Sequence, residues 1–168
     1  MVNDALFMSN RDDWETPDYV FKPIHESLEF TIDAAANKDN AKFSRYWTEE
    51  DDALSQDWEG EIVWCNPPYG RKQVAFLEKG PEAKTACFLI PVRPDTKVWH
   101  RVIIPSAFMI VFIEGRITFV GAKAPAPFPS CLVIFNQDDR LLQESMIDTN
   151  AGPEERPLLR SKKFEKDV

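Results

Sequence analysis

Two unbroken apolar runs constrain the fold of this chain more than any other feature of its sequence. The runs are TACFLIPV at residues 85–92 and AFMIVFIEG at residues 107–115. A strand with one solvated face alternates apolar and polar side chains, whereas a strand covered on both faces is apolar throughout. Because helices on both faces of a sheet provide that cover, the runs predict an α/β fold with a mostly parallel sheet.

Three more segments are expected to join this sheet as strands. They are residues 28–36 (LEFTIDAAA), 61–65 (EIVWC) and 131–135 (CLVIF). The last of them follows the strand at 107–115 through a connection rich in glycine and proline, and we expect this final pair to be antiparallel. The segment between the first two, residues 37–60, is polar and irregular.

A first helix is expected near the N-terminus. Thr16 is suited to be its N-cap and Pro17 its first residue, although Pro23 should kink or break it. Its apolar face consists of Val20, Phe21, Ile24 and Leu28. The spacing of these four residues fits one face of a helix.

Two further helices are expected between strands. One spans residues 71–80 and ends at Gly80, because glycine is the commonest residue at helix C-termini. The other begins at Asp95 or Thr96 and ends near Ile104. Strands that alternate with helices in this way favour parallel pairing.

The chain is expected to form one domain over residues 14–136, flanked by polar segments at 1–13 and 137–168. The C-terminal segment should be flexible, and it holds a basic cluster of Arg156, Arg160, Lys162, Lys163 and Lys166. No run of about 18 apolar residues is present, so we expect no membrane span. The acidic N-terminus also lacks the features of a signal peptide.

Cysteine and histidine usage predicts a cytoplasmic protein without a metal site. Cys65, Cys87 and Cys131 lie far apart in apolar surroundings, which is typical of buried, reduced thiols. His25 and His100 are isolated, and no CxxC motif occurs.

The charges are distributed unevenly along the chain. Net charge is −8 overall, but residues 63–131 carry 9 basic and 4 acidic residues, a net of +5. A basic middle third inside an acidic protein permits a local surface that faces phosphate groups.

The motif Asn66-Pro67-Pro68-Tyr69 directly follows the strand at 61–65. The amino group of adenine or cytosine is a poor nucleophile because its lone pair is delocalised into the ring. The side-chain oxygen of Asn66 and the carbonyl of Pro67 could accept its two hydrogens and free that lone pair. Tyr69 offers a face on which a base can stack. This pattern predicts methyl transfer to an amino nitrogen, although a capped Pro-Pro loop explains the residues structurally.

These residues and four other blocks resemble the short Dam-type DNA N6-adenine methyltransferases of phages and prophages. The resemblance covers about residues 12–136, and its blocks are DDWETPDYVF, FTIDAAANKDNAKFSRYWTEEDDAL, VWCNPPYG, IPVRPDTKVWH and GRITFVGAKAPAPFPSCLVIF. It implies a single-domain Rossmann-like methyltransferase fold with S-adenosylmethionine as methyl donor. It also implies a role in DNA modification or protection from restriction inside a bacterial host.

The resemblance implies the roles of individual residues. Asn66, Pro67, Pro68 and Tyr69 would be catalytic. The donor would be bound by Thr16, Pro17, Asp33, Ala34, Ala35, Asp52 and Asn66, with Asp33 near its ammonium group and Asp52 near its adenine. The usual glycine-rich loop is replaced by Ala34-Ala35-Ala36. DNA and a flipped-out adenine would be contacted by Tyr69, Arg93, Thr96, Phe119 and Phe128.

Several other functions remain open from the sequence. The same tetrapeptide can serve methyl transfer to glutamine in proteins, to RNA, or to N4 of cytosine. A degenerate, non-catalytic binding protein would fit the missing glycines and the sequence pI of about 4.8.

Overall fold

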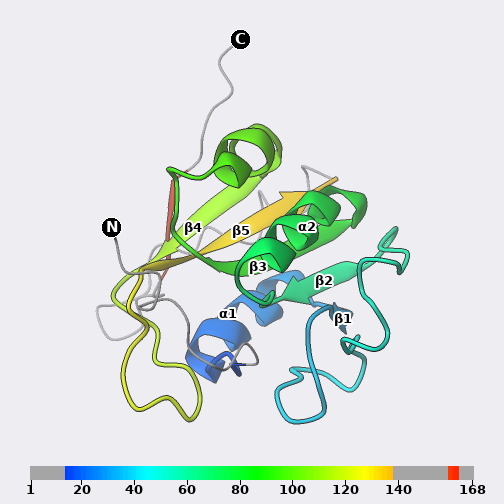
Figure 1. Ribbon diagram of the computed structural model, residues 1–168. Helices are drawn as coiled ribbons and strands as arrows, with labels where there is room; N and C mark the ends of the chain where they lie inside the picture. The colour runs from blue at the N-terminus through cyan, green and yellow to red at the C-terminus, as the bar shows by residue number, and fades with distance from the viewer. Residues whose placement is uncertain (1–13, 138–158, 163–168) are drawn as a thin grey trace.

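The computed structural model describes residues 14–137 and a strand at 159–162, which build one mixed α/β sheet (Figure 1). The sheet has six strands in the order β1-β2-β3-β5-β4-β6. Their bounds are β1 Ile32–Asp33, β2 Ile62–Cys65, β3 Thr85–Pro91, β4 Met109–Ile113, β5 Ser130–Asn136 and β6 Leu159–Lys162. Every strand that the apolar runs predict is therefore present.

Most strands of the sheet run in one direction. β1 pairs with β2, and β2 with β3, in parallel. β5 lies between β3 and β4 and runs antiparallel to both, so β4 points the same way as β3. This confirms the mostly parallel sheet and the antiparallel pairing of the last predicted strand.

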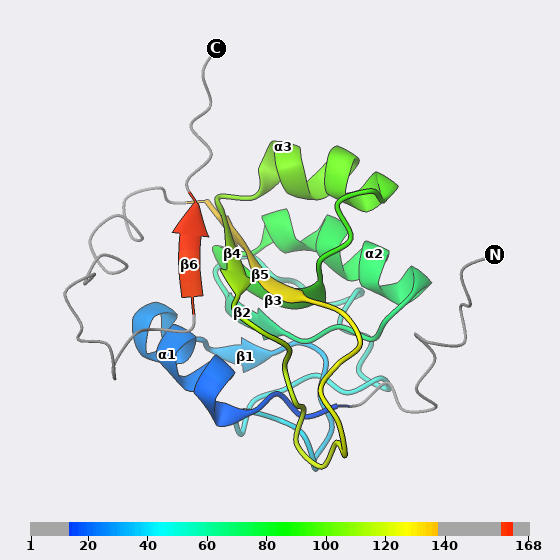
Figure 2. The ribbon, with the colours of Figure 1, turned by 90° about the vertical axis from the view of Figure 1, so that its left-hand side faces the viewer.

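Helices cover both faces of the sheet (Figure 2). Helix α1 (Asp18–Leu28) lies on one face, and α2 (Arg71–Lys79) lies on the other. The second face also carries a helical segment built from a π-helical turn, η3 (Trp99–Ile103), and α3 (Ile104–Ser106). No helix within the described ranges is both long and apolar enough to span a membrane.

Alternate residues of the central strands belong to two separate cores. On β3, Ala86, Phe88 and Ile90 pack with the side chains of α2 and η3. Cys87 and Leu89 point to the opposite face and pack with α1. A strand that is buried on both faces cannot alternate with polar residues, which explains its unbroken apolar sequence. The three cysteines are buried and unpaired, and burial raises the pKa of each thiol.

The first helix differs from its sequence prediction in two details. Pro17, rather than Thr16, occupies the N-cap position, and its carbonyl accepts the backbone N–H of Val20 at 3.0 Å. Pro23 does not end the helix, which continues to Leu28. Pro23 has no N–H that could donate to the carbonyl of Tyr19, four residues earlier. Both residues are exposed, so water can bind this carbonyl instead. The predicted apolar face is buried as expected.

Two further differences concern strands. The strand predicted at 28–36 is only two residues long as β1, because α1 extends to Leu28 and Glu29 then adopts a left-handed conformation with φ of 52°. In the polar segment 137–168, residues 159–162 form β6, which pairs antiparallel with β4 at the sheet edge. The segment 1–13, and Arg156, Lys163 and Lys166 of the predicted basic cluster, lie outside the described residues.

Candidate active site

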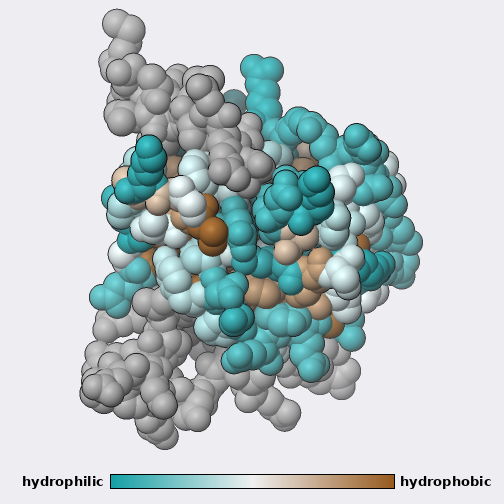
Figure 3. Space-filling view, turned by 90° about the horizontal axis from the view of Figure 1, so that it is seen from below, coloured by the Kyte–Doolittle hydropathy of each residue, from teal (hydrophilic) through white to brown (hydrophobic). Residues whose placement is uncertain are grey.

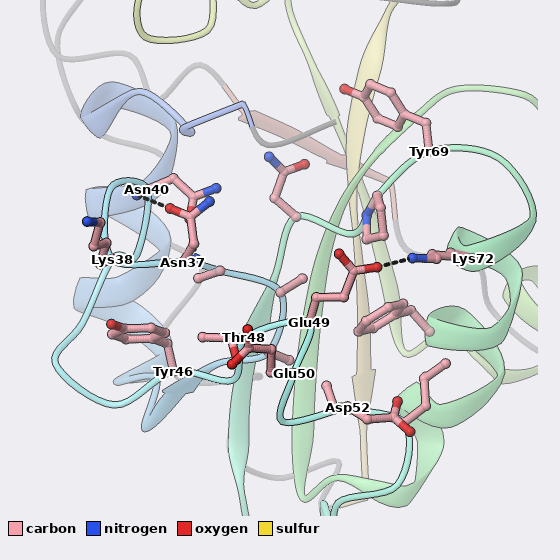
Figure 4. Close-up of a pocket in the computed structure, with 18 of the residues that line it drawn as sticks. Asn37, Lys38, Asn40, Tyr46, Thr48, Glu49, Glu50, Asp52, Tyr69 and Lys72 are labelled. Carbon is pink, nitrogen blue, oxygen red and sulfur yellow. Dashed lines mark hydrogen bonds and ion pairs between the residues drawn. The ribbon is translucent and has the colours of Figure 1, made fainter. Parts of the chain in front are cut away.

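A cavity of about 1260 Å³ lies where β1 and β2 end. Its walls come from three stretches of chain: the residues after β1, the irregular loop that follows them, and the NPPY loop with the first turns of α2 (Figure 4). The carboxyl ends of neighbouring parallel strands are the common position of ligand sites in such sheets. The cavity therefore lies where a ligand site is expected in a sheet of this kind.

The cavity brings together part of the predicted site. Its lining includes Ala34, Ala35, Asp52, Asn66, Pro68 and Tyr69. The other predicted residues lie outside the lining: Thr16, Pro17, Asp33, Pro67, Arg93, Thr96, Phe119 and Phe128. In Figure 4, Tyr69 lies at one end of the cavity and Asp52 at the opposite end. The two ends of the cavity could therefore bind two different molecules that react with each other.

The side-chain amide of Asn66 is held in one orientation. Its Nδ2 donates a hydrogen bond to the backbone carbonyl of Trp14 at 2.9 Å. A carbonyl can only accept, so a flipped amide would lose this bond. The contact therefore fixes which side of the amide presents Oδ1, the atom that would accept a hydrogen from a target amino group.

The two phenylalanines predicted to contact a flipped base are buried against the site. Phe128 packs edge-on against Tyr69, with ring centroids 5.5 Å apart and an interplanar angle of 87°. Phe119 packs against Trp14 at 6.3 Å. Both phenylalanines expose less than a tenth of their surface. Each therefore contacts the neighbourhood of the NPPY motif as a packing partner.

Asp33 lies behind the cavity wall and organises the loop after β1. Its carboxylate accepts the backbone N–H of Ala35 at 3.3 Å and that of Lys42 at 3.1 Å. Burial raises the pKa of Asp33 to about 6, because the loss of hydration outweighs these two hydrogen bonds and the charge of Lys42. A carboxyl group with this pKa changes its charge near physiological pH.

Lys42 joins this loop to the start of α1. Its buried Nζ forms ion pairs with Glu15 at 2.9 Å and Asp18 at 3.3 Å. Thr16 and Pro17, which are themselves buried, lie between these two acids in the sequence. The ion pairs therefore hold the predicted donor-binding segment against the loop that contains Asp33. Nothing in the sequence pattern marks Lys42 as more than one charge in a polar loop.

Asp52 has an unusual backbone conformation at the edge of the cavity. Its φ is 49°, in the left-handed region that few residues other than glycine adopt. Its carbonyl accepts hydrogen bonds from both the backbone and the hydroxyl of Ser55, which stabilise the turn. Strained conformations of this kind cluster at binding sites. The conformation is a second reason, besides the family resemblance, to consider Asp52 part of the site.

Polar residues that the sequence did not single out complete the cavity. They are Asn37, Lys38, Asn40, Tyr46, Thr48, Glu49, Glu50, Arg71 and Lys72. Lys72 on α2 forms an ion pair with Glu49, which connects two walls across the cavity (Figure 4). These residues belong to irregular loops or to the start of a helix. The spacing of apolar residues in the sequence therefore could not predict that they line a cavity.

Arg93 and Thr96 lie after β3, on a turn that does not line the cavity. The hydroxyl of Thr96 donates to the carbonyl of Arg93 at 2.7 Å, and the Arg93 guanidinium lies 3.9 Å from Asp95. Arg93 is exposed, and its contacts here are local to the turn. A role of Arg93 in binding a phosphate is therefore a proposal.

Sequence comparison assigns the chain to a family. The model of the DNA N-6-adenine-methyltransferase (Dam) family matches residues 4–137. The chain belongs to this family. The resemblance that the sequence blocks indicated is thereby confirmed, and the matched range contains the whole cavity and the NPPY motif.

Two phage members of the Dam family illustrate the similarity. The DNA N-6-adenine-methyltransferase of Haemophilus phage HP1 (strain HP1c1) is 32% identical over 120 residues, which cover 67% of this chain and 69% of the phage protein. The protein of the same name from Escherichia phage T1 is 29% identical over 114 residues, which cover 64% of this chain. That match covers only 47% of the T1 protein.

Proposed function

We propose that this protein transfers a methyl group from S-adenosylmethionine to the N6 amino group of adenine in DNA. The observation that carries the proposal is the oriented amide of Asn66, which stands directly after β2 on the wall of the cavity. Membership of the Dam family and the names of the two phage relatives support the choice of adenine and DNA. The proposed catalytic domain is residues 14–136, with a Rossmann-like fold.

The residues around the cavity suit the proposed donor. Ala34, Ala35 and Ala36 form one wall, and their small side chains allow a ligand to approach the backbone closely. Asp52 lines the cavity and is proposed to bind the adenine of the donor. Thr16 and Asp33 are buried and do not line the cavity, so their proposed role at the methionine end of the donor rests on the family resemblance alone. A cavity of about 1260 Å³ exceeds the usual range for a single small ligand, so a donor and a base could share it.

The donor, when bound, supplies an electrophilic methyl group on a positively charged sulfur. Oδ1 of Asn66 and the carbonyl of Pro67 would each accept one hydrogen of the adenine amino group. As the new N–C bond forms and the old S–C bond breaks, N6 becomes tetrahedral and positively charged, and both acceptors then bind it more strongly. N6 afterwards releases one proton to water. The chemistry requires no general base.

The target adenine must leave the duplex to reach a pocket at the end of a strand. Tyr69 is proposed to stack on the flipped base, and the exposed basic residues of the middle third, including Arg93, to contact phosphates. A DNA substrate would also place the activity in the cytoplasm of a bacterial host. On the described surface seen from below, apolar areas are small and separated by polar side chains, which favours a polar partner (Figure 3).

Labelled methyl transfer tests the proposed substrate. The protein is incubated with donor carrying a radioactive methyl group and, in separate reactions, with unmethylated DNA, RNA or a protein extract. We expect incorporation into DNA alone. Label in protein or RNA would assign the motif to glutamine or RNA chemistry, and donor binding without any incorporation would identify a non-catalytic binding protein.

A further inference from the structure

The connection between β4 and β5 packs directly on Tyr69 and on Trp14, whose carbonyl holds the Asn66 side chain. It leaves β4 at Ile113 and returns at Ser130, and in Figures 1 and 2 it extends beyond the end of the sheet beside the short described stretch that leads into α1. We refer to residues 114–129 as the β4–β5 loop. The role inferred for this loop rests on the proposed methyl transfer.

The first contact reaches Asn66 through residues 14 and 15. The ring of Phe119 packs on the ring of Trp14, and the backbone N–H of Val120 donates to the carbonyl of Glu15 at 3.1 Å. The carbonyl of Trp14, one residue earlier, is the acceptor that orients the amide of Asn66. The loop therefore helps to position the carbonyl oxygen of Trp14, which in turn orients the side chain of Asn66.

The second contact reaches Tyr69 directly. Phe128 lies edge-on against the Tyr69 ring, and it is almost completely buried. Next to it, the carbonyl of Pro129 accepts the backbone N–H of Val92 at 2.9 Å, which ties this end of the loop to the segment that leaves β3. An aromatic ring packed at right angles to the tyrosine limits the rotation of the tyrosine side chain.

Hydrogen bonds within the β4–β5 loop and burial of its base stabilise its conformation. The N–H of Ala126 donates to the carbonyl of Ile117 at 2.7 Å across the loop, and Ala122 donates to Phe119 at 3.0 Å in a turn at its tip. Gly121 permits that turn with a φ of 77°. Ile117 and Phe119 are buried in the same core as α1, so the base of the loop is anchored to the body of the protein.

We propose that the β4–β5 loop is a brace that positions the catalytic pair, with Phe119 acting on Asn66 through Trp14 and Phe128 acting on Tyr69. Pro67 and Pro68 fix the backbone of the motif, but they leave the side-chain torsions of Asn66 and Tyr69 undetermined. Hydrogen-bond acceptors stabilise a transition state only when they are held within a fraction of an ångström of the productive position. Trp14, Phe119 and Phe128 are therefore positioning residues.

Substitutions that loosen each contact test the brace. Trp14→Ala removes the ring and keeps the carbonyl, whereas Trp14→Phe keeps an aromatic ring against Phe119. Phe128→Ala removes the contact to Tyr69, and Phe128→Leu is used if the alanine variant does not fold. Phe135→Leu is the control, since Phe135 is also a buried phenylalanine but pairs with Ala86 near the opposite end of β3.

Single-turnover methylation of DNA, donor affinity and unfolding by urea are measured for each folded variant. We expect Trp14→Ala and the Phe128 variant to lower the single-turnover rate by about 10- to 100-fold while donor affinity changes less than about twofold. Trp14→Phe should restore most of the rate. Phe135→Leu should lose stability and keep the wild-type rate per folded molecule.

A double substitution separates positioning from a general structural effect. Because Trp14 is proposed to act through Asn66, Trp14→Ala should have little further effect on the rate in an Asn66→Ala background. An equal loss in both backgrounds, or rates of the Trp14 and Phe128 variants equal to that of Phe135→Leu, would overturn the brace. A wild-type protein that methylates no DNA would instead refute the proposed function.

Discussion

At Asp33, burial and hydrogen bonding act on the carboxyl group in opposite directions. The two backbone N–H groups favour the charged form, but the loss of hydration has the larger effect and raises the pKa to about 6. Such a group destabilises the fold when it is charged. The ammonium group of a bound donor would supply the missing counter-charge, so the carboxylate is better suited to the complex than to the protein alone.

Donor binding should therefore depend on pH. Protonation of Asp33 removes the charge that attracts the donor's ammonium group, so affinity should fall as the pH is lowered through about 6. If only the charged form binds, affinity at pH 5 should be about tenfold lower than at pH 7.5. Calorimetry at both pH values measures this difference. In Asp33→Ala the affinity should be weak and independent of pH, and an unchanged pH profile in that variant would exclude Asp33 from the site.

Stability should follow the opposite trend over the same range. The folded pKa of Asp33 is about 6 and its ordinary value is 3.8. Between these values the folded state binds more protons than the unfolded state, so the Asp33 contribution to the free energy of unfolding decreases as pH rises. The full effect is on the order of 3 kcal/mol. Urea unfolding of wild type and Asp33→Ala between pH 4 and pH 7 isolates this contribution. If the free energy of unfolding changed with pH by the same slope in both proteins, the raised pKa of Asp33 would be contradicted.

Asn66 should affect the chemical step more than binding. Asn66→Ala removes an acceptor that binds N6 most strongly in the transition state, so kcat should fall by about 10²–10³ with little change in donor affinity. Stability should fall by only about 1 kcal/mol, for the lost hydrogen bond to Trp14. Single-turnover assays on folded, donor-binding protein make the comparison. Full activity of the variant would limit Asn66 to a structural role.

Among the helices and strands, the end of α2 shows that a residue predicted for one reason can be required for another. The sequence predicts that this helix ends at Gly80, and glycine most often ends a helix in a left-handed conformation. Its φ is −47°, which any residue can adopt. A Cβ at this position would instead lie 2.6 Å from the ring of Phe135 and 2.7 Å from that of Phe88. Gly80 is therefore required by the close approach of α2 to β3 and β5.

Gly80→Ala should accordingly destabilise the protein by about 1–3 kcal/mol, the usual cost of overpacking a core. If glycine served only to end the helix, alanine would be neutral or stabilising, since it loses less backbone entropy on folding. Urea unfolding of Gly80→Ala decides the sign. The cost should be smaller in a Phe135→Leu background, where the crowded ring is absent.

The sequence predicted the elements whose side chains repeat regularly, and missed contacts between distant loops. Apolar runs identified β3, β4 and β5 because two-sided burial leaves no room for polar residues. The NPPY motif is predicted to follow the end of a strand because Pro67 has no N–H and cannot continue the hydrogen-bond ladder of the sheet. The bond from Asn66 to Trp14 joins residues 52 positions apart, and no local pattern encodes it. The same holds for the ion pairs of Lys42 and for the pairing of β6.

At the scale of the whole molecule, the described elements all belong to one sheet and its two helical layers. Direct readout of a base sequence in a groove needs several side chains on an inserted element. Among the described residues, the longest irregular segments line the cavity or brace the motif, which leaves little chain for such an element. We therefore expect recognition of the flipped adenine and only one or two neighbouring bases.

Sequencing of DNA after methylation by the protein measures this specificity. The expected result is methylation at many adenines that share a motif of two or three bases. A single motif of six or more fixed bases would contradict the prediction and would require a recognition element outside the described residues.

The central claim is that the methyl group is transferred to N6 of adenine, and analysis of the modified nucleosides tests it most directly. Unmethylated DNA is incubated with the protein and S-adenosylmethionine, digested to nucleosides and separated with standards by mass spectrometry. The account predicts N6-methyladenine as the only new product, formed by the wild-type protein and at least about a hundredfold more slowly by Asn66→Ala. N4-methylcytosine, or DNA without any new methylated nucleoside, would contradict it.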